Sequence, residues 1–368
     1  MRGVLDVRPG ERTVTFGAFA ALFAITGGHT LLETARDALF LAKLPPERLP
    51  WMYLAIAAVG LLVARVGKRA SGAVGASLGA AIAGTAAFWT LSSGGGSAFV
   101  YALFVWTGTV GSWMVLQFWL LLGGTMHVGQ AKRLFGFIGA GGVLGATAGA
   151  ATARAVAGTM ETRHLLMAAC VLFALAIVPA PLLQARAHSA LRPPERATNE
   201  PRATGSLIAD ARSVAGDGYL RRILGLVLVA TVCLTFVDYV FKLIVAREVP
   251  KAELGTTFAT IYTVLNGLAL LVQIGLVGTA LRALGVHRAL AILPLLALAG
   301  GFGVAALPVL ATAVTLKGFD GVLRHSMHKT TTELLYLPLA EDIRSRAKPV
   351  IDLVGQRGGQ ALASVVLL

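Results

Sequence analysis

Three ionisable residues, Glu33, Arg36 and Asp37, interrupt the apolar run Thr13–Ala42. A charged side chain at the centre of a membrane costs about 2.5 to 3.5 kcal/mol on insertion scales, so it persists where it contacts a partner or a water-filled path. In a helix, Glu33 lies one turn before the other two residues. This spacing fits either a self-neutralising ion pair or an Arg36 that binds an anion while both carboxylates hold it. His29, one turn earlier, is a weaker candidate ligand.

A second acid–base pair, Asp238 and Lys242, lies in the apolar run Ile223–Ala246. The i,i+4 spacing places both side chains on one helix face. A local ion pair explains them as well as a ligand role does. If this run and Thr13–Ala42 are equivalent helices, a basic residue from each would suit a polyanionic solute.

The run Val309–Leu337 is the most polar. One polar stripe has the helical spacing i, i+3, i+7 and i+11 and contains Lys317, Asp320, Arg324 and His328. A second stripe, on the neighbouring face, contains His325, Lys329 and Glu333. Lipid cannot solvate both faces, so we expect this helix to border a water-filled path. We expect Arg324 and Lys329 to bind the solute and Glu333 to position them, with Lys317 near enough to a membrane boundary to snorkel.

Aromatic residues beside amides offer contacts of another kind. Trp106 and Trp113 are spaced i,i+7 with Gln117 one turn further, and Tyr262 and Asn266 share a later run. Such faces can stack on a nucleobase and hydrogen-bond to it. Interior packing is the commoner explanation, and Trp113 and Tyr262 are the two that we keep as candidate substrate contacts.

The elements that carry these residues are predicted to be membrane-spanning helices. Of 368 residues, 56% are hydrophobic and 14% are charged, whereas soluble domains have about 25% charged residues. Mean hydropathy is +0.75. A spanning helix needs about 20 apolar residues, and runs of that length recur; barrel strands would need about ten. The sequence therefore predicts an all-α membrane protein in a lipid bilayer.

Eleven apolar runs are candidate spans, and we expect the chain to end within the eleventh. They are Thr13–Ala42, Trp51–Val66, Ser71–Leu91, Ala98–Leu122, Leu134–Ala157, Leu165–Gln184, Ile223–Ala246, Thr256–Leu281, Leu290–Ala306, Val309–Leu337 and Val350 to the end. A polar, proline-containing segment separates the sixth from the seventh. We therefore expect an N-terminal six-helix half (1–186), a cytoplasmic linker (187–216) with a short amphipathic helix around Ser206–Val214, and a C-terminal half (217–368) of about five spans.

Positive charge alternates from loop to loop, with an excess in the N-terminal segment and in the central linker. The positive-inside rule then predicts a cytoplasmic N-terminus and linker. The net charge of +14 is spread over loops rather than a basic folded domain, so nucleic acid is not an expected partner. Cys170 and Cys233 lie in apolar runs, which favours neither a disulfide framework nor a metal site. The sequence contains no hydrolytic triad or nucleotide-hydrolysis motif, and we expect neither an enzyme nor a cofactor.

Short internal matches indicate a repeat. Ala131-Lys132 followed by Gly139 and Gly142 recurs as Ala347-Lys348 followed by Gly355 and Gly358, and Asp37-Ala-Leu-Phe40 is similar to Asp238-Tyr-Val-Phe241. Together with the loop charges, these matches favour two parallel six-helix halves, the arrangement of major facilitator transporters. Gly141, Gly145 and Gly149 form a GxxxGxxxG ridge that is typical of a close-packing helix face.

Several stretches together resemble the ATP/ADP translocase family. They are Arg36-Asp37, Lys132-Arg133-Leu-Phe-Gly-Phe-Ile-Gly-Ala-Gly-Gly, Asp238-Tyr-Val-Phe-Lys242, Thr332-Glu333-Leu-Leu-Tyr336-Leu-Pro338-Leu, Arg346-Ala-Lys348-Pro-Val-Ile-Asp352 and Gly355-Gln-Arg357-Gly358. The family comprises nucleotide exchangers of plastids and intracellular bacteria and related bacterial proteins of unassigned role. The resemblance covers nearly the whole chain.

The resemblance implies twelve spans and membrane-embedded charged residues that hold nucleotide phosphates. Arg36 occupies the basic position before the first-span aspartate, where the exchangers have lysine. Glu333 matches the acidic residue of a Lys-Glu pair, whose lysine is replaced by Thr332. Relatives of this type are similar to the membrane portions of longer chains that have helical-repeat or cyclic-nucleotide-binding modules, so a fused or associated cytoplasmic module is an expected partner.

The leading hypothesis is a major-facilitator-type carrier in a bacterial cytoplasmic (inner) membrane that moves a nucleotide-like phosphorylated anion by alternating access. Four basic residues would bind phosphate, and four acidic residues would position them and shuttle protons: Arg36, Lys242, Arg324 and Lys329, with Glu33, Asp37, Asp238 and Glu333. Two alternatives stay open. One is a non-transporting membrane sensor or scaffold with a C-terminal cytoplasmic module, and the other is a proton-coupled carrier of a different organic anion.

Overall fold

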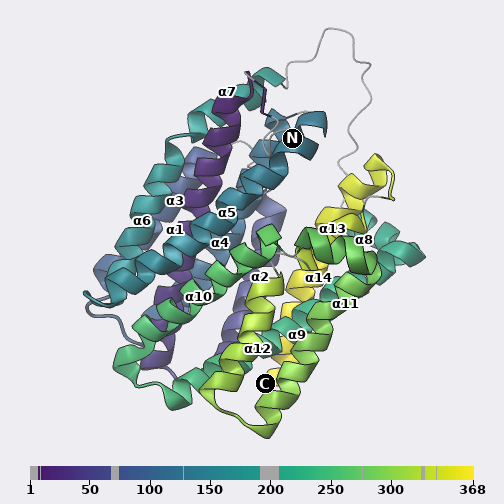
Figure 1. The fold of residues 1–368 in the computed structure, drawn as a ribbon. Helices are drawn as coiled ribbons and strands as arrows, with labels where there is room; N and C mark the ends of the chain where they lie inside the picture. Colours follow the sequence, from purple (N-terminus) through teal and green to yellow (C-terminus); the bar gives the residue numbers. More distant parts are fainter. Residues whose placement is uncertain are drawn as a thin grey trace. The chain divides into compact units, whose positions relative to one another are not determined.

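A computed structural model describes residues 7–8, 10–67, 74–126, 128–190, 207–275, 277–324, 328–336 and 338–368. Within these ranges every regular element is a helix (Figure 1). The α-helices are α1 Arg12–Lys43, α2 Leu49–Gly67, α3 Val74–Leu91, α4 Ser97–Thr125, α5 Val128–Ala157, α6 His164–Ile177, α7 Ala180–Ala190, α8 Leu207–Gly216, α9 Gly218–Glu248, α10 Leu254–Gly275, α11 Val277–Ala306, α12 Leu310–Leu323, α13 Lys329–Leu334 and α14 Glu341–Leu367. Short 3₁₀ turns, Pro46–Arg48 and Lys251–Glu253, precede α2 and α10.

Eight stretches of helix among the described residues are long and apolar enough to cross a membrane, by length and composition. They correspond to α1, α3, α4, α5, α6 with α7, α9, α10 and α11. The other three expected spans correspond to α2, to α12 with α13, and to α14. The chain is therefore a multi-pass membrane protein whose described elements are helical.

Contacts divide the chain into two compact units, each containing segments that are distant in sequence. The α1 unit comprises Met1–Lys43, Arg65–Asn199 and Ala252–Thr263. The α9 unit comprises Leu44–Ala64, Glu200–Lys251 and Val264–Leu368. The start of α10 thus belongs with α1, and most of α2 belongs with α9. The linear division into halves that we expected from the sequence remains a prediction.

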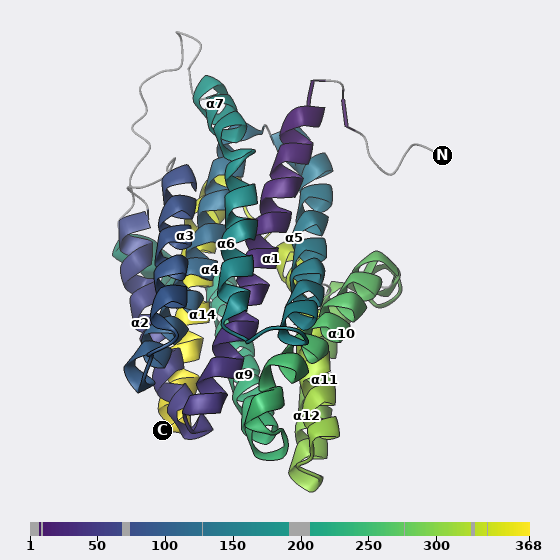
Figure 2. The same ribbon diagram turned by 90° about the vertical axis from the view of Figure 1, so that its left-hand side faces the viewer.

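Helix α1 is central to the first unit, where it contacts α4, α5, α6 and α7 (Figures 1 and 2). The predicted glycine ridge of α5 faces α1: a Cβ atom added at Gly145 or Gly149 would collide with the α1 backbone at Phe23 or Gly27. The Thr26 hydroxyl also donates a hydrogen bond of 2.8 Å to the Gly142 carbonyl. Glycine therefore permits the close approach of two spanning helices.

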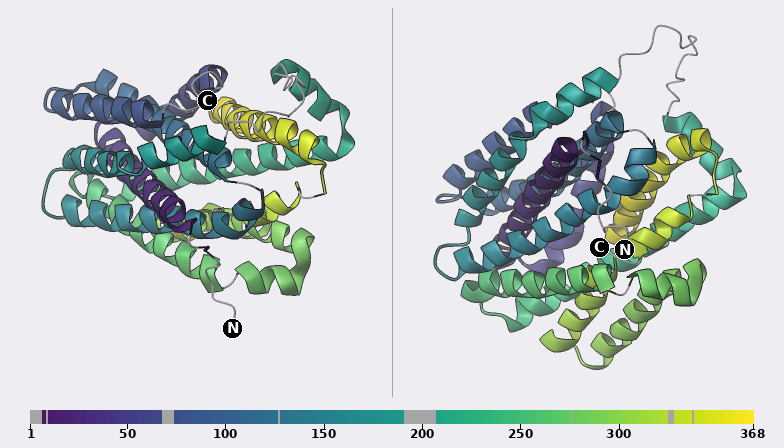
Figure 3. Two further views of the ribbon diagram at one scale, coloured as in Figure 1. Left: turned by 90° about the horizontal axis from the view of Figure 1, so that it is seen from above. Right: turned by 45° about the horizontal axis from the view of Figure 1, so that its top comes forward.

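Helix α9 has the corresponding role in the second unit, where α14 runs beside it (yellow and teal in Figure 3) and α12 packs against it. A Cβ atom at Gly355 or Gly359 of α14 would meet α9 side chains or backbone. The first and fifth apolar runs thus pack together, as do the seventh and eleventh. Of the repeated glycines, however, Gly139 and Gly358 have no atom within 4 Å of an added Cβ.

The structure corrects the start of the eleventh run. Helix α14 begins at Glu341 rather than at Val350, so Arg344 and Arg346 lie on a helix and not in a loop, with Pro349 inside it. Arginine has a high helix propensity, and the side chains of Ala347 and Val350 are buried in a cluster with residues of α8 and α9. This burial offsets the hydrogen bond that proline removes.

Other boundaries also differ from the predicted runs. Helix α11 breaks at Gly285, whose φ of 72° is a conformation that favours glycine. The predicted linker helix is confirmed as α8, while residues 191–206 of the linker lie outside the described residues. In the tenth run, residues 325–327, which include His325, also lie outside the described residues. Helix α13 ends at Leu334, before the end of the predicted run.

Candidate functional site

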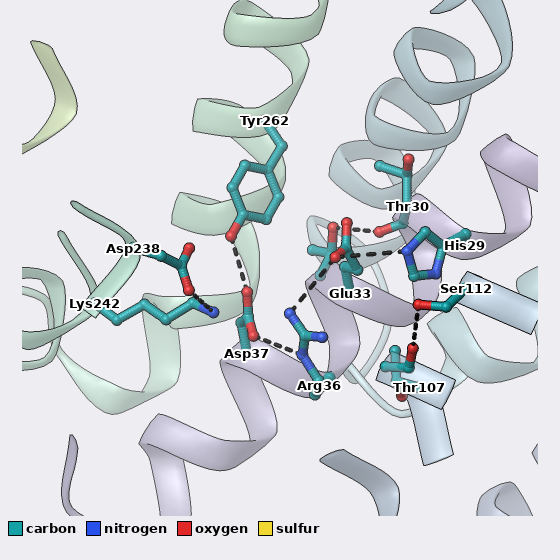
Figure 4. A network of polar contacts seen from close by, with 12 residues as sticks. His29, Thr30, Glu33, Arg36, Asp37, Thr107, Ser112, Asp238, Lys242 and Tyr262 are labelled. Carbon is teal, nitrogen blue, oxygen red and sulfur yellow. Dashed lines mark hydrogen bonds and ion pairs between the residues drawn. The ribbon is translucent and has the colours of Figure 1, made fainter. Parts of the chain in front are cut away.

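The charged residues of α1 form a compact group around Arg36 (Figure 4). The Arg36 Nε donates a hydrogen bond of 2.8 Å to Asp37 Oδ1, and its Nη2 lies 3.7 Å from Glu33 Oε1. The guanidinium carbon lies 4.5 Å from the centroid of the Phe104 ring on α4, a distance typical of a cation–π contact. One edge of the guanidinium is thus held tightly by Asp37, and its contact with Glu33 is loose.

Asp37 is nearly inaccessible, with 1% of its side chain exposed. Its Oδ2 accepts a hydrogen bond of 2.8 Å from the hydroxyl of Tyr262 on α10 (Figure 4). The two partners share the charge of this buried carboxylate, which would otherwise be costly. Tyr262, which we kept as a stacking candidate, contacts Asp37 through its hydroxyl.

His29 and Glu33 lie side by side at the end of this group (Figure 4). His29 Nε2 is 3.6 Å from Glu33 Oε1. The His29 ring lies against Gly111 of α4, where a Cβ atom would overlap it. The Glu33 side chain is 40% exposed, compared with 9% for Arg36. We call His29, Glu33, Arg36, Asp37 and Tyr262 the α1 cluster.

A second group surrounds Asp238 on α9. Lys242 Nζ lies 2.8 Å from Asp238 Oδ2, and Lys317 Nζ of α12 lies 2.7 Å from Oδ1. The Tyr53 hydroxyl on α2 donates a hydrogen bond of 2.8 Å to Oδ2. Asp238 therefore joins three helices of its unit, and it pairs with Lys242, which has 2% of its side chain exposed.

Asp320 extends this group along α12. Arg324 binds it through two hydrogen bonds, Nε to Oδ1 at 2.6 Å and Nη2 to Oδ2 at 2.7 Å. Lys317 Nζ lies 3.3 Å from Asp320 Oδ2, so it bridges both aspartates. Our expectation that Lys317 snorkels to a boundary is therefore wrong. We call Tyr53, Asp238, Lys242, Lys317, Asp320 and Arg324 the α9 cluster.

The two clusters share one pattern. Each contains a repeat-related aspartate, Asp37 or Asp238, that is paired with a cation on its own helix and accepts a hydrogen bond from a tyrosine hydroxyl. Their charges differ. The α1 cluster contains two carboxylates and one guanidinium beside His29, whereas the α9 cluster contains two carboxylates and three cations.

The remaining candidate residues from the sequence either lie outside the two clusters or have side chains outside the described part of the chain. The Trp113 indole donates a hydrogen bond of 3.1 Å to Ser77 of α3, which places it in helix packing. The side chains of Lys329 and Glu333 lie outside the described residues. Sequence reasoning missed Tyr53, for which no spacing gave a signal. It left Asp320 unassigned, although its position one turn before Arg324 could have indicated the pair.

Comparisons with known proteins concern the fold. Neither a family model nor a curated protein sequence matches the chain. The solved nucleoside transporter NupG is similar over 96% of this chain and 90% of its own, with 11% identity and a TM-score of 0.66. The xylose transporter XylE from E. coli, in a partially occluded inward-open conformation, covers 96% and 91% with 10% identity and a TM-score of 0.58.

A bacterial homologue of the iron transporter ferroportin, in an outward-facing state, is 14% identical over 96% of this chain and 91% of its own, with a TM-score of 0.57. The chain has the fold of major-facilitator-type transporters. Arg36 and Asp238 thus lie on helices of a fold that these carriers share.

Proposed function

We propose that this chain is a secondary transporter, working by alternating access, for a nucleotide or a nucleotide-like phosphorylated anion. The observation that carries the proposal is the presence of three basic side chains, Lys242, Lys317 and Arg324, in the α9 cluster. Its five charged side chains belong to apolar helices, where an unpaired charge is expensive. Basic side chains at such depth are suited to hold an anionic solute.

Arg324 is the residue of the α9 cluster that would contact this anion directly. Its side chain is 34% exposed, and its Nε and Nη2 are engaged by Asp320. A guanidinium held by one carboxylate is oriented in advance and can present a further N–H to phosphate. Lys242 and Lys317 would supply the field that favours an anion at this place.

Three further considerations support a transporter in this class. The fold is shared with solved carriers, although a shared fold does not fix a function. The stretches that resemble ATP/ADP translocases include Arg36-Asp37 and Asp238-Tyr-Val-Phe-Lys242, which contribute to the two clusters. The repeat favours two parallel six-helix halves with equivalent first and seventh helices.

A thermal-shift panel on the purified protein tests the substrate class. The panel contains AMP, ADP, ATP, glucose 6-phosphate, inorganic phosphate and citrate. A ligand that binds only the folded state stabilises it by about 2.7 kcal/mol at a concentration of 100 Kd. We expect nucleotides to raise the unfolding temperature and citrate and glucose 6-phosphate to leave it unchanged.

The variant Arg324→Gln should abolish this shift, and Arg288→Gln, at an exposed position on α11, should retain it. A shift with citrate alone would instead support a carrier of another organic anion. If no nucleotide produces a shift, or if Arg324→Gln responds as the wild type does, the proposed substrate class is wrong.

A further inference from the structure

A small apolar cluster joins α8 and the first turns of α9 and α14 at one end of the second unit (Figure 1). Helices α9 and α14 run side by side in the same direction, because a Cβ atom at Gly355 would meet Val227 and one at Gly359 would meet Thr231. The buried members of the cluster from these three helices are Val214, Leu220, Ile223, Ala347, Val350 and Ile351. The beginnings of α9 and α14 therefore lie close together, with α8 packed against both.

Five arginines surround this apolar cluster. Each is one or two residues away from a buried member of the cluster, or three in the case of Arg344. Four of them are exposed and Arg344 is half-buried. We call the five the arginine patch: Arg212 of α8, Arg221 and Arg222 of α9, and Arg344 and Arg346 of α14.

The carboxylates of these segments do not pair with the arginine patch. The Asp217 carboxylate accepts hydrogen bonds of 2.8 and 2.9 Å from backbone N–H groups in the first turn of α9, so it caps that helix. Asp210 lies on α8, and Asp352 of α14 has an interaction of its own. The side chains of Glu341 and Asp342 lie outside the described residues. Among the side chains that the structure describes, none of the five arginines forms an ion pair.

The arginine patch lies at a membrane boundary. The stretch Gly218–Glu248, which is α9, is long and apolar enough to cross a membrane, so its first turn reaches the depth of the lipid headgroups. Tyr219 and Ile343 are 39% and 43% exposed beside the arginines, and the Tyr219 hydroxyl donates a hydrogen bond of 2.7 Å to the Leu335 carbonyl. Tyrosine is enriched at this depth because its ring is apolar and its hydroxyl is polar. Exposed arginines and apolar side chains together fit a lipid surface.

We propose that the arginine patch binds the phosphate groups of anionic phospholipids in the leaflet at the beginning of α9. A guanidinium matches a phosphate through two parallel N–H groups. Four to eight basic residues at the end of a spanning helix are typical of contact with anionic lipid. Packing of Val214 in the apolar cluster holds α8 beside α9, which brings Arg212 to the same place. The lipid site lies several turns along α9 from Asp238, and the inference does not depend on the transported solute.

Native mass spectrometry of the purified full chain tests this proposal, because it resolves each bound lipid by its mass. The protein in detergent is mixed with equal amounts of phosphatidylglycerol and phosphatidylcholine that have the same acyl chains. We expect wild type to bind phosphatidylglycerol more tightly than phosphatidylcholine, and this preference to decrease as salt is raised. Equal binding of the two lipids by wild type would overturn the proposal.

One variant combines Arg221→Gln, Arg222→Gln and Arg346→Gln and so removes three charges of the arginine patch. Each basic residue beside an anionic lipid surface strengthens binding about fivefold. We therefore expect the preference for phosphatidylglycerol to fall at least about tenfold in this variant. An unchanged preference would show that the arginine patch does not bind lipid phosphate.

A matched control removes the same charge at exposed arginines elsewhere. It combines Arg12→Gln on α1, Arg154→Gln on α5 and Arg247→Gln in the last turn of α9, and it should keep the wild-type preference. An equal loss in this control would mean that net charge, and not the arginine patch, attracts the lipid, and would overturn the proposal. Size-exclusion chromatography shows whether each variant is folded. If the patch variant is unfolded, Arg212→Gln on the exposed face of α8 should lower the preference about fivefold, and no change in it would overturn the proposal.

Glycerol 3-phosphate distinguishes a lipid site from a site for soluble phosphate compounds. It carries a phosphate group and has no acyl chains. Added to the complex of wild type with phosphatidylglycerol, it should leave the lipid bound, because the exposed apolar side chains beside the arginines contribute to lipid binding. Displacement of phosphatidylglycerol by glycerol 3-phosphate at equal concentration would assign the arginine patch to a soluble ligand and contradict the proposal.

Discussion

At the scale of single residues, buried charges are compensated by partners that are both near and distant in sequence. The pairs Asp238–Lys242 and Asp320–Arg324 have i,i+4 spacing and could be predicted from the sequence because a helix brings such residues together. Tyr53 and Lys317 reach Asp238 from other helices. Their contribution depends on helix packing, which residue spacing does not encode.

Asp238 should be important for stability because two lysines pair with it. The variant Asp238→Asn removes a carboxylate partner of both Lys242 and Lys317, and breaking a buried ion pair costs about 3 to 5 kcal/mol. Thermal unfolding in detergent measures this loss. The control is Glu161→Gln, which breaks an exposed pair with Arg163 and should cost less than about 1 kcal/mol. Equal stability of the two variants would refute this account of the α9 cluster.

At the scale of helices, apolar runs predicted the elements and most of their boundaries. The start of α14 was not predictable, since its first turns are rich in charge and precede Pro349, and burial of Ala347 and Val350 makes them helical. The ridge Gly141, Gly145 and Gly149 was predicted as a packing face. The structure was needed to identify α1 as the helix that packs on this ridge, because a pattern of small residues does not indicate which helix approaches it.

A larger side chain on this ridge should weaken the packing of α5 on α1. In Gly149→Val the new side chain would overlap the backbone at Gly27, and overpacking of this kind costs about 1 to 3 kcal/mol. We expect a lower unfolding temperature in detergent. Gly139→Ala lies on the same helix, where an added Cβ meets no atom within 4 Å, and should be neutral or slightly stabilising. A similar loss in both variants would show that the effect is not one of packing.

At the scale of the molecule, hydropathy and the short repeat predicted the all-helical membrane class and the major facilitator fold, which solved transporters share at 10 to 14% identity. The sequence could not predict that most of α2 belongs with α9, or that the start of α10 belongs with α1. The unit to which a segment belongs depends on packing between distant parts of the chain. Local composition does not reveal that packing. The cytoplasmic position of the N-terminus and the twelve-helix layout remain predictions from the loop charges and the resemblance.

The central claim is that this fold moves a nucleotide-like anion through residues of the two clusters. Uptake of radiolabelled AMP and ATP into proteoliposomes tests it most directly. We expect wild type to accumulate at least one of the two nucleotides above the level of protein-free liposomes. Arg36→Ala and Arg324→Ala should each lose at least about 90% of the uptake rate, which corresponds to a rise of about 1.4 kcal/mol in the activation free energy. Arg288→Ala should retain the wild-type rate. Wild-type uptake no greater than that of empty liposomes, or full uptake by both Arg36→Ala and Arg324→Ala, would contradict the account.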